Sequence, residues 1–318
     1  MDSVSRKNIL PGMPPVAVVL CTFNGASYIR SQLDAVICQT YQNLQILITD
    51  DASTDETADI IKEYAAADTR IRFSINAKNI GYNKNFEKTI GLCEADFIAF
   101  CDQDDIWELN KIEVMMNHWP ANALFVYSLS GSFTGTDFAN RKPAPDIVYT
   151  AFSDVHYLVF NSPVHGHASM MKKELYYRCL PFPADIFYDW WISMHAAATG
   201  LVGCVPQTLS WHRVHQHNSS RNITSIEDKA YRNEQLRQQC VYFIETFCKR
   251  NILKQPQQDS LQRYAAILKT MDGKKFSWPM FAYAFKNRKL VFHYKKQKLF
   301  IFISYLKHSF KMAYKGLL

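Results

Sequence analysis

The chain has 318 residues, of which 48% are hydrophobic and 20% charged. This composition can fill a hydrophobic core and excludes a predominantly disordered or collagen-like protein, and the length suggests about two structural units or one large α/β domain with an appendage. The eight cysteines are scattered without a C-x-x-C pair, which favours a reducing compartment over a disulfide scaffold or zinc ribbon. Since no apolar stretch approaches the roughly 20 residues of a membrane-spanning helix and no secretory signal is evident, we expect a cytoplasmic protein.

Strands and helices are expected to alternate through the first hundred residues. The apolar run 16–23 predicts a buried strand that ends at the turn Asn24-Gly25. Apolar spacing then predicts helices over 27–39, 53–64 and 83–93, separated by strands over 44–49, 71–75 and 96–101. Such alternation predicts a mostly parallel sheet with helices on both faces, and the polar residues at its strand ends should meet at one edge, where such sheets bind ligands.

The pattern is less regular after residue 120. Strands are expected at about 123–133, 167–171 and 202–211, with a loop-like segment over 134–160 between the first two. An apolar helix should begin at about residue 189 and end at 199, and a polar amphipathic helix should cover about 227–250.

Three carboxylates lie in the four-residue run Asp102-Gln103-Asp104-Asp105, directly after an expected buried strand. They repel one another unless a cation or hydrogen-bond donors offset the charge, and Mg²⁺ or Mn²⁺ typically uses one or two carboxylates together with substrate phosphates. We therefore expect a metal-assisted diphosphate site here. The alternative is a solvated loop whose acids cap helices.

Asp50-Asp51 is a second acidic strand end, followed by Ser53, Thr54 and Asp55. Asp51 is placed to accept hydrogen bonds from a base or from ribose hydroxyls, while its neighbours supply helix caps. Neither G-x-G-x-x-G nor G-x-x-x-x-G-K-[ST] occurs in the sequence, which excludes the dinucleotide-binding fingerprint and the P-loop.

Four motifs in chain order together resemble glycosyltransferase family 2: Thr22-Phe23-Asn24-Gly25, Asp50-Asp51-Ala52-Ser53-Thr54-Asp55, Asn79-Ile80-Gly81 and Cys101-Asp102-Gln103-Asp104-Asp105. The similarity covers about residues 16–120 and extends more loosely to about 220. It implies a GT-A fold and transfer of a sugar with inversion of configuration. The family usually has Gly where Ala52 stands, a mild departure in a turn.

The resemblance also implies an organisation and a role for each matching residue. A tail (1–15) would precede a nucleotide-sugar half (16–120), an acceptor half (121–222) and a helical, basic C-terminal region (223–318). The donor site would be formed by Thr22, Asn24, Asp51, Asp102, Gln103, Asp104 and Arg213. Asp104 and Asp105, completed by His215, would hold the Mn²⁺ or Mg²⁺ that bridges the donor diphosphate; surface histidines without a metal role are the alternative for His215.

Inversion by single displacement requires a base for the acceptor hydroxyl. We assign this role to Asp189 in Phe187-Tyr188-Asp189-Trp190-Trp191, because burial among aromatic side chains should raise its pKa. A helix cap is the alternative role for Asp189, and Asp185 is the competing carboxylate. We expect the acceptor site to include Trp190, Trp191 and His167. The alternative for at least one of the two tryptophans is a position in the hydrophobic core.

The C-terminal segment 273–318 carries eleven Lys or Arg and no Asp or Glu. Since the formal net charge of the chain is +7, the remainder carries −4. Basic residues interleaved with bulky apolar ones predict a helix at an anionic membrane surface. Nucleic-acid binding, which we do not expect, and an ordinary helical subdomain are the alternatives.

These features predict a cytoplasmic family 2 glycosyltransferase, peripheral at the inner membrane face, that uses a nucleotide-sugar donor and a glycan or lipid-linked acceptor in surface polysaccharide synthesis. The Asp102–Trp107 and Tyr188–Trp191 runs are similar to rhamnosyltransferases, which suggests dTDP-rhamnose or a UDP-sugar as donor. A metal-dependent nucleotidyltransferase is one alternative, but the turn after the first strand lacks the basic residues that would hold a triphosphate. A non-catalytic membrane-surface module is the other.

Overall fold

The computed structural model describes residues 12–216, 218, 229–273, 275–296 and 301–316. The chain forms two compact units. The first contains the chain up to residue 145 together with 164–196 and 200–214, and the second contains 146–163, 197–199 and the chain from 215 onward. Most of the expected N-terminal tail (1–11) and the expected start of the long helix at 227–228 lie outside the described residues.

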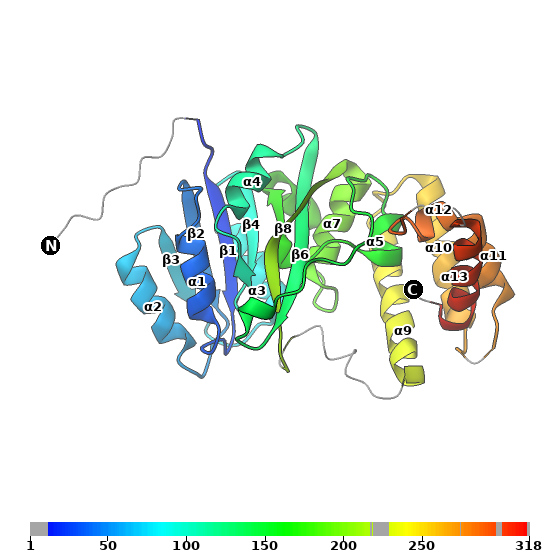
Figure 1. Ribbon diagram of the computed structural model, residues 1–318, viewed down its shortest axis with the longest axis horizontal. Helices are drawn as coiled ribbons and strands as arrows, with labels where there is room; N and C mark the ends of the chain where they lie inside the picture. The colour runs from blue at the N-terminus through cyan, green and yellow to red at the C-terminus, as the bar shows by residue number, and fades with distance from the viewer. Residues whose placement is uncertain (1–11, 217, 219–228, 274, 297–300, 317–318) are drawn as a thin grey trace. The chain divides into compact units, whose positions relative to one another are not determined.

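The first unit is built on an eight-stranded mixed sheet of order β3-β2-β1-β4-β7-β6-β8-β5 (Figure 1). The four strands of the N-terminal part run parallel, as the alternating pattern predicted. β7 is antiparallel to both its neighbours, β6 is parallel to β8, and β5 is antiparallel to β8. The strands are β1 (Val16–Thr22), β2 (Leu44–Asp50), β3 (Ile71–Ile75), β4 (Phe97–Asp102), β5 (Ile106–Trp107), β6 (Ala123–Thr134), β7 (Ser169–Lys172) and β8 (Leu201–Val214).

Helices cover both faces of this sheet because its central strands are apolar on both sides. In β1, Val16, Val18 and Leu20 point into a core shared with α1, α2 and α4. On the other face, Phe100 of β4 contacts Phe86 of α3 with ring centroids 6.3 Å apart and Tyr188 of α7 at 5.3 Å. The helices and turns are α1 (Ile29–Ile37), α2 (Thr57–Ala67), α3 (Tyr82–Gly91), α4 (Lys111–Asn117), η1 (Phe138–Asn140), η2 (Gly166–Ala168), α6 (Lys173–Cys179) and α7 (Tyr188–Thr199).

The second unit is helical, as expected for the C-terminal region. A polar network around the buried His156 joins two of its helices: Nδ1 of His156 lies 2.6 Å from Oδ1 of Asp154, and Nε2 lies 3.0 Å from Oγ of Ser260. Among the described residues, no helix combines the length and apolar character needed to cross a bilayer. The helices of the second unit are α5 (His156–Asn161), α9 (Lys229–Cys248), α10 (Gln255–Thr270), α11 (Trp278–Lys286), α12 (Arg288–Val291) and α13 (Ile301–Lys315).

Ala52 adopts a left-handed backbone conformation with φ +61° in the turn after β2. This conformation costs an alanine roughly 1–2 kcal/mol, and glycine would lose about 0.4–1 kcal/mol through its more flexible unfolded chain. We therefore expect Ala52→Gly to raise the free energy of unfolding by about 0.5–1 kcal/mol in urea titrations. The exposed helical residue Ala66 is the control, since Ala66→Gly should lower the same quantity by up to about 1 kcal/mol. A loss of stability in Ala52→Gly would contradict the prediction.

Candidate active site

The polar ends of β1, β2 and β4 lie side by side, as the strand pattern predicted. Thr22 is paired with Asp50 across the parallel sheet, and Cys21 is paired with Asp102. The buried Thr22 hydroxyl donates to Oδ1 of Asp50 at 2.7 Å, and the backbone N–H of Asp51 donates to the Thr22 carbonyl at 2.8 Å. Three of the four sequence motifs therefore meet at one edge.

Gln103 fixes the loop after β4 against the turn after β1. Its Oε1 accepts from the Phe23 N–H at 2.9 Å, and its Nε2 donates to the Phe23 carbonyl at 3.0 Å. Gly25 makes room for this contact, because a Cβ at that position would lie 2.3 Å from Oε1 of Gln103. Asn24, predicted to lie near the nucleotide, accepts from the Thr54 N–H at 2.9 Å through its side-chain oxygen.

Asp51 ties the end of β2 to the Asn79-Ile80-Gly81 motif. Its Oδ1 accepts from the Ile80 N–H at 2.9 Å and from the Asn76 amide at 2.8 Å, and its Oδ2 accepts from the Gly81 N–H at 2.8 Å. The Asp51 side chain is buried. Its structural role is to hold the loop that begins α3, and the base contact expected of it stays a prediction.

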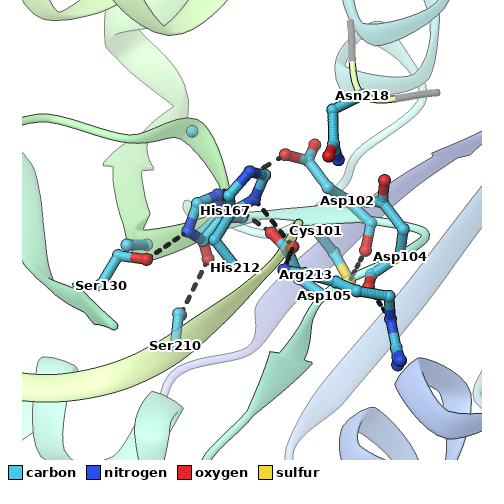
Figure 2. Close-up of polar contacts among 12 residues, drawn as sticks. Cys101, Asp102, Asp104, Asp105, Ser130, His167, Ser210, His212, Arg213 and Asn218 are labelled. Atoms are coloured by element: carbon cyan, nitrogen blue, oxygen red, sulfur yellow. Dashed lines mark hydrogen bonds and ion pairs between the residues drawn. The ribbon is translucent and has the colours of Figure 1, made fainter. Parts of the chain in front are cut away.

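The acidic loop, residues 102–105, ends at Asp105. This carboxylate forms a cluster with His167 and His212 (Figure 2). Nδ1 of His167 lies 3.0 Å from Oδ2 of Asp105, and Nδ1 of His212 lies 3.1 Å from Oδ1. The pairing of Ile106 in β5 with Trp211 in β8 places Asp105 opposite His212. Oγ of Ser130 lies 2.7 Å from Nε2 of His167, which fixes the ring from its other side.

The two histidines of the cluster have opposite electrostatic environments. Burial lowers the pKa of His167 to about 3, although the Asp105 charge opposes this. Burial also lowers the pKa of His212, but the hydrogen bond and charge of Asp105, with Asp104 and Asp102, outweigh it and bring the pKa to about 9. The ammonium group of Lys111 donates to the His167 carbonyl. Burial lowers the pKa of Lys111 to about 7.

The cluster has the donor set of a divalent-cation site. Its three ligand atoms lie within 4.8 Å of one another. Within the described part of the chain, Oδ2 of the fully buried Asp105 makes no hydrogen bond of acceptable geometry despite its short distance from His167. Carboxylate and imidazole together suit Mn²⁺ better than Mg²⁺, which prefers oxygen ligands alone.

Arg213 is buried, and its expected contact with the donor phosphate stays a prediction. Arg213 is only 4% exposed. Nε donates to the Asp104 carbonyl at 2.7 Å, and the two terminal nitrogens donate to the Gly135 carbonyl and to Oγ of Ser31. Arg213 therefore positions the backbone that carries Asp104 (Figure 2).

Asp189 lies in the first turn of α7 with its carboxylate recessed beside Gly166. Oδ2 accepts from the Gly166 N–H at 3.0 Å, and Oδ1 accepts from the Trp190 N–H at 2.8 Å. Burial raises the pKa of Asp189 to about 6, and the charge of Asp102 acts in the same direction, while the two hydrogen bonds oppose it. The neighbouring Tyr188 hydroxyl lies 3.4 Å from Oδ1 of Asp102, so α7 and the acidic loop border one site.

The three residues expected at the acceptor site have different environments. Trp191 is 1% exposed and donates its indole N–H to the Cys179 carbonyl at 2.7 Å, the core position that was the alternative for one tryptophan; its acceptor contact stays a prediction. Trp190 is half-buried, and its acceptor role stays a prediction. His167 belongs to the cluster with Asp105.

His215 was expected to complete the metal site. It belongs to the second unit, where its backbone N–H donates to Oδ1 of Asn218 at 2.7 Å. Its role as a ligand stays a prediction. His212 was not chosen from the sequence, because the strand was expected to end at Trp211 and the family resemblance pointed to His215 in the segment that follows.

Comparison with known proteins identifies the family. The model for "Glycosyl transferase family 2" matches residues 17–180. The chain belongs to glycosyltransferase family 2. An uncharacterised Mycobacterium tuberculosis protein is 26% identical over 209 residues, which are 64% of this chain and 59% of that protein. The chain therefore spans about three fifths of the length of this mycobacterial relative.

Solved structures confirm the GT-A fold expected from the motifs. S. aureus TarS (residues 1–349, in complex with UDP-GlcNAc) is similar with a TM-score of 0.61 and 14% identity, covering 95% of this chain and 89% of that one. The mannosyltransferase PcManGT from Pyrobaculum calidifontis, in complex with GDP-Man and Mn²⁺, is similar with a TM-score of 0.55 and 16% identity, covering 95% and 81%. At this identity the likeness concerns the fold.

Proposed function

We propose that this family 2 protein is an inverting glycosyltransferase. It transfers a sugar from a nucleoside-diphosphate donor to a hydroxyl group of a glycan or lipid-linked acceptor in surface polysaccharide synthesis. The observation that carries this proposal is the recessed carboxylate of Asp189, whose pKa of about 6 leaves it ionised and basic at neutral pH. It lies on the helix that also directs Tyr188 toward Asp102 of the acidic loop.

In the proposed reaction, Asp189 accepts the proton of the acceptor hydroxyl as that oxygen attacks the anomeric carbon. The new carbon–oxygen bond forms on one face while the bond to the diphosphate breaks on the opposite face, so that the configuration inverts. The nucleoside diphosphate leaves with the electron pair of the broken bond. The backbone N–H groups of Gly166 and Trp190 hold the carboxylate in place during proton transfer.

The residues present fit a divalent cation, and two ligand sets share Asp105. One combines Asp105 with His167 and His212, whose ligand atoms lie close together; the other, expected from the motifs, combines it with Asp104 and His215 and stays a prediction. When bound, the cation would offset the negative charge that develops on the leaving diphosphate. The Mn²⁺ in the PcManGT complex supports this cofactor.

A panel of nucleotide sugars tests the proposal. We expect UDP- or dTDP-sugars, including dTDP-rhamnose, to raise the midpoint of thermal unfolding in the presence of Mn²⁺, because a ligand that binds the native state at 100 times its Kd stabilises it by about 2.7 kcal/mol. GDP-sugars should give a smaller shift, and omission of Mn²⁺ or addition of EDTA should reduce the shift for every donor. If no nucleotide sugar changes the midpoint and none is hydrolysed slowly in water, the proposed function is wrong.

A further inference from the structure

The outward face of α13 is apolar where a solvated helix would be polar. Phe302, Leu306, Phe310 and Tyr314 recur every fourth residue and are 57%, 37%, 44% and 50% exposed, and Ile303 beside them is 61% exposed. Spacing by four places side chains on one side of a helix. The buried residues Ser309, Met312 and Ala313 lie on the adjoining side of the helix, so the apolar row borders the buried side and stays partly exposed.

α11 extends the same surface. Phe276, just before α11, lies 5.4 Å from Phe310 between ring centroids, and Phe281 lies 4.8 Å from the same ring. Phe285 contacts Phe302 at 5.5 Å. Trp278 is 69% exposed and lies 4.9 Å from Phe276. We call the exposed set Trp278, Phe302, Ile303, Leu306, Phe310 and Tyr314 the aromatic face.

Hydrogen bonds at Ser277 connect the two helices that carry the aromatic face. The Ser277 side chain caps α11 by accepting from the Met280 N–H, and the Ser277 N–H donates to the Ala313 carbonyl of α13 at 2.9 Å. The two helices therefore present one surface.

Lysines flank the aromatic face without acidic neighbours in this part of the sequence. Lys307, Lys311 and Lys315 form the adjoining row of α13 and are exposed, and the whole segment 273–318 has eleven Lys or Arg and no Asp or Glu. Lysine stems can lie along apolar surface while their ammonium groups reach outward. Aromatic side chains with flanking lysines match the boundary between acyl chains and anionic headgroups.

We propose that α11 and α13 form a docking surface for an anionic phospholipid bilayer. The positive charge of this face favours a bilayer over a second copy of the chain. A second copy would bring two positive surfaces together, whereas anionic lipid headgroups neutralise the lysines as the rings enter the bilayer surface. This inference concerns the second unit and does not rest on the proposed reaction.

Co-sedimentation of the full chain with vesicles tests the docking surface. We expect binding to vesicles of phosphatidylcholine with phosphatidylglycerol to be at least about tenfold tighter than to phosphatidylcholine alone, and to weaken as salt screens the lysines. The triple variant Lys307→Gln/Lys311→Gln/Lys315→Gln and the double variant Trp278→Ser/Ile303→Ser should each reduce binding at least about tenfold.

Matched controls separate this face from general charge or hydrophobicity. Tyr231→Ser/Tyr242→Ser removes aromatic rings that are 56% and 45% exposed on α9 of the same unit, and Lys249→Gln/Lys254→Gln removes exposed lysines elsewhere; both should bind vesicles as the parent does. Unchanged unfolding midpoints show that each variant is folded. Equal binding to both vesicle types, equal losses in the controls, or tighter binding to single-stranded nucleic acid than to anionic vesicles would each overturn the proposal, as would a dimer that buries Trp278.

Discussion

Replacing Asp189 with asparagine is expected to lower kcat by about 10²–10⁴-fold, the range that general base catalysis contributes. Asparagine has nearly the same shape, so it can still accept one of the two hydrogen bonds from Gly166 and Trp190. The loss of stability should stay near 1 kcal/mol. Turnover at saturating donor and acceptor, measured beside urea unfolding, separates the chemical effect from the structural one.

The pH profile gives the same prediction a second readout. A carboxylate acts as a base only when ionised, and the pKa of Asp189 is raised to about 6 by burial. In the parent protein, kcat/KM should therefore fall about tenfold per pH unit as pH drops below about 6 and should level off above it. In Asp189→Asn this limb should disappear from the residual activity.

Asp185 provides the matched control, because it is an exposed carboxylate four residues before Asp189. Asp185→Asn should retain the turnover of the parent. If Asp185→Asn loses activity while Asp189→Asn keeps it, the base has been assigned to the wrong carboxylate.

The parallel strands and the strand-end acids were predictable from the sequence, because both depend on local patterns. The helices between successive strands predict that β1 to β4 run parallel, and the pairs β1–β2 and β2–β3 follow chain order, whereas β4 pairs with β1. The meeting of Thr22, Asp50 and Asp102 then follows from topology. Their contacts with ligands remain predictions.

The cluster with His212 was not predictable in the same way. β8 continues to Val214, past the expected end at 211, because it pairs along its length with β6 and near its end with β5. This non-local pairing places His212 on Asp105 and buries Arg213 against the Asp104 carbonyl. Likewise, the short helix α5 lies in a segment expected to be loop-like, since six residues are too few for a periodic signal.

Replacing Asp105 with asparagine is expected to weaken Mn²⁺ binding by at least about tenfold, because this carboxylate belongs to the cluster with His167 and His212 and also to the ligand set that the motifs imply. It should also lower the free energy of unfolding by about 2 kcal/mol, the cost of removing a buried charged acceptor from its donors. Those donors include the Arg213 N–H at 2.9 Å and His212 at 3.1 Å. Electron paramagnetic resonance of free Mn²⁺ measures the affinity, and urea unfolding measures the stability.

Single replacements then separate the two ligand sets. Loss of Mn²⁺ affinity in His212→Gln, with Asp104→Asn unaffected, would assign the cation to the cluster, and the reverse would assign it to Asp104 as the motifs imply. His118→Gln is the control, since His118 is exposed at the end of α4. If Asp105→Asn binds Mn²⁺ as tightly as the parent does, both proposed ligand sets are wrong, because each of them depends on this carboxylate. Asp105 would then be a structural residue that orders β5 against β8.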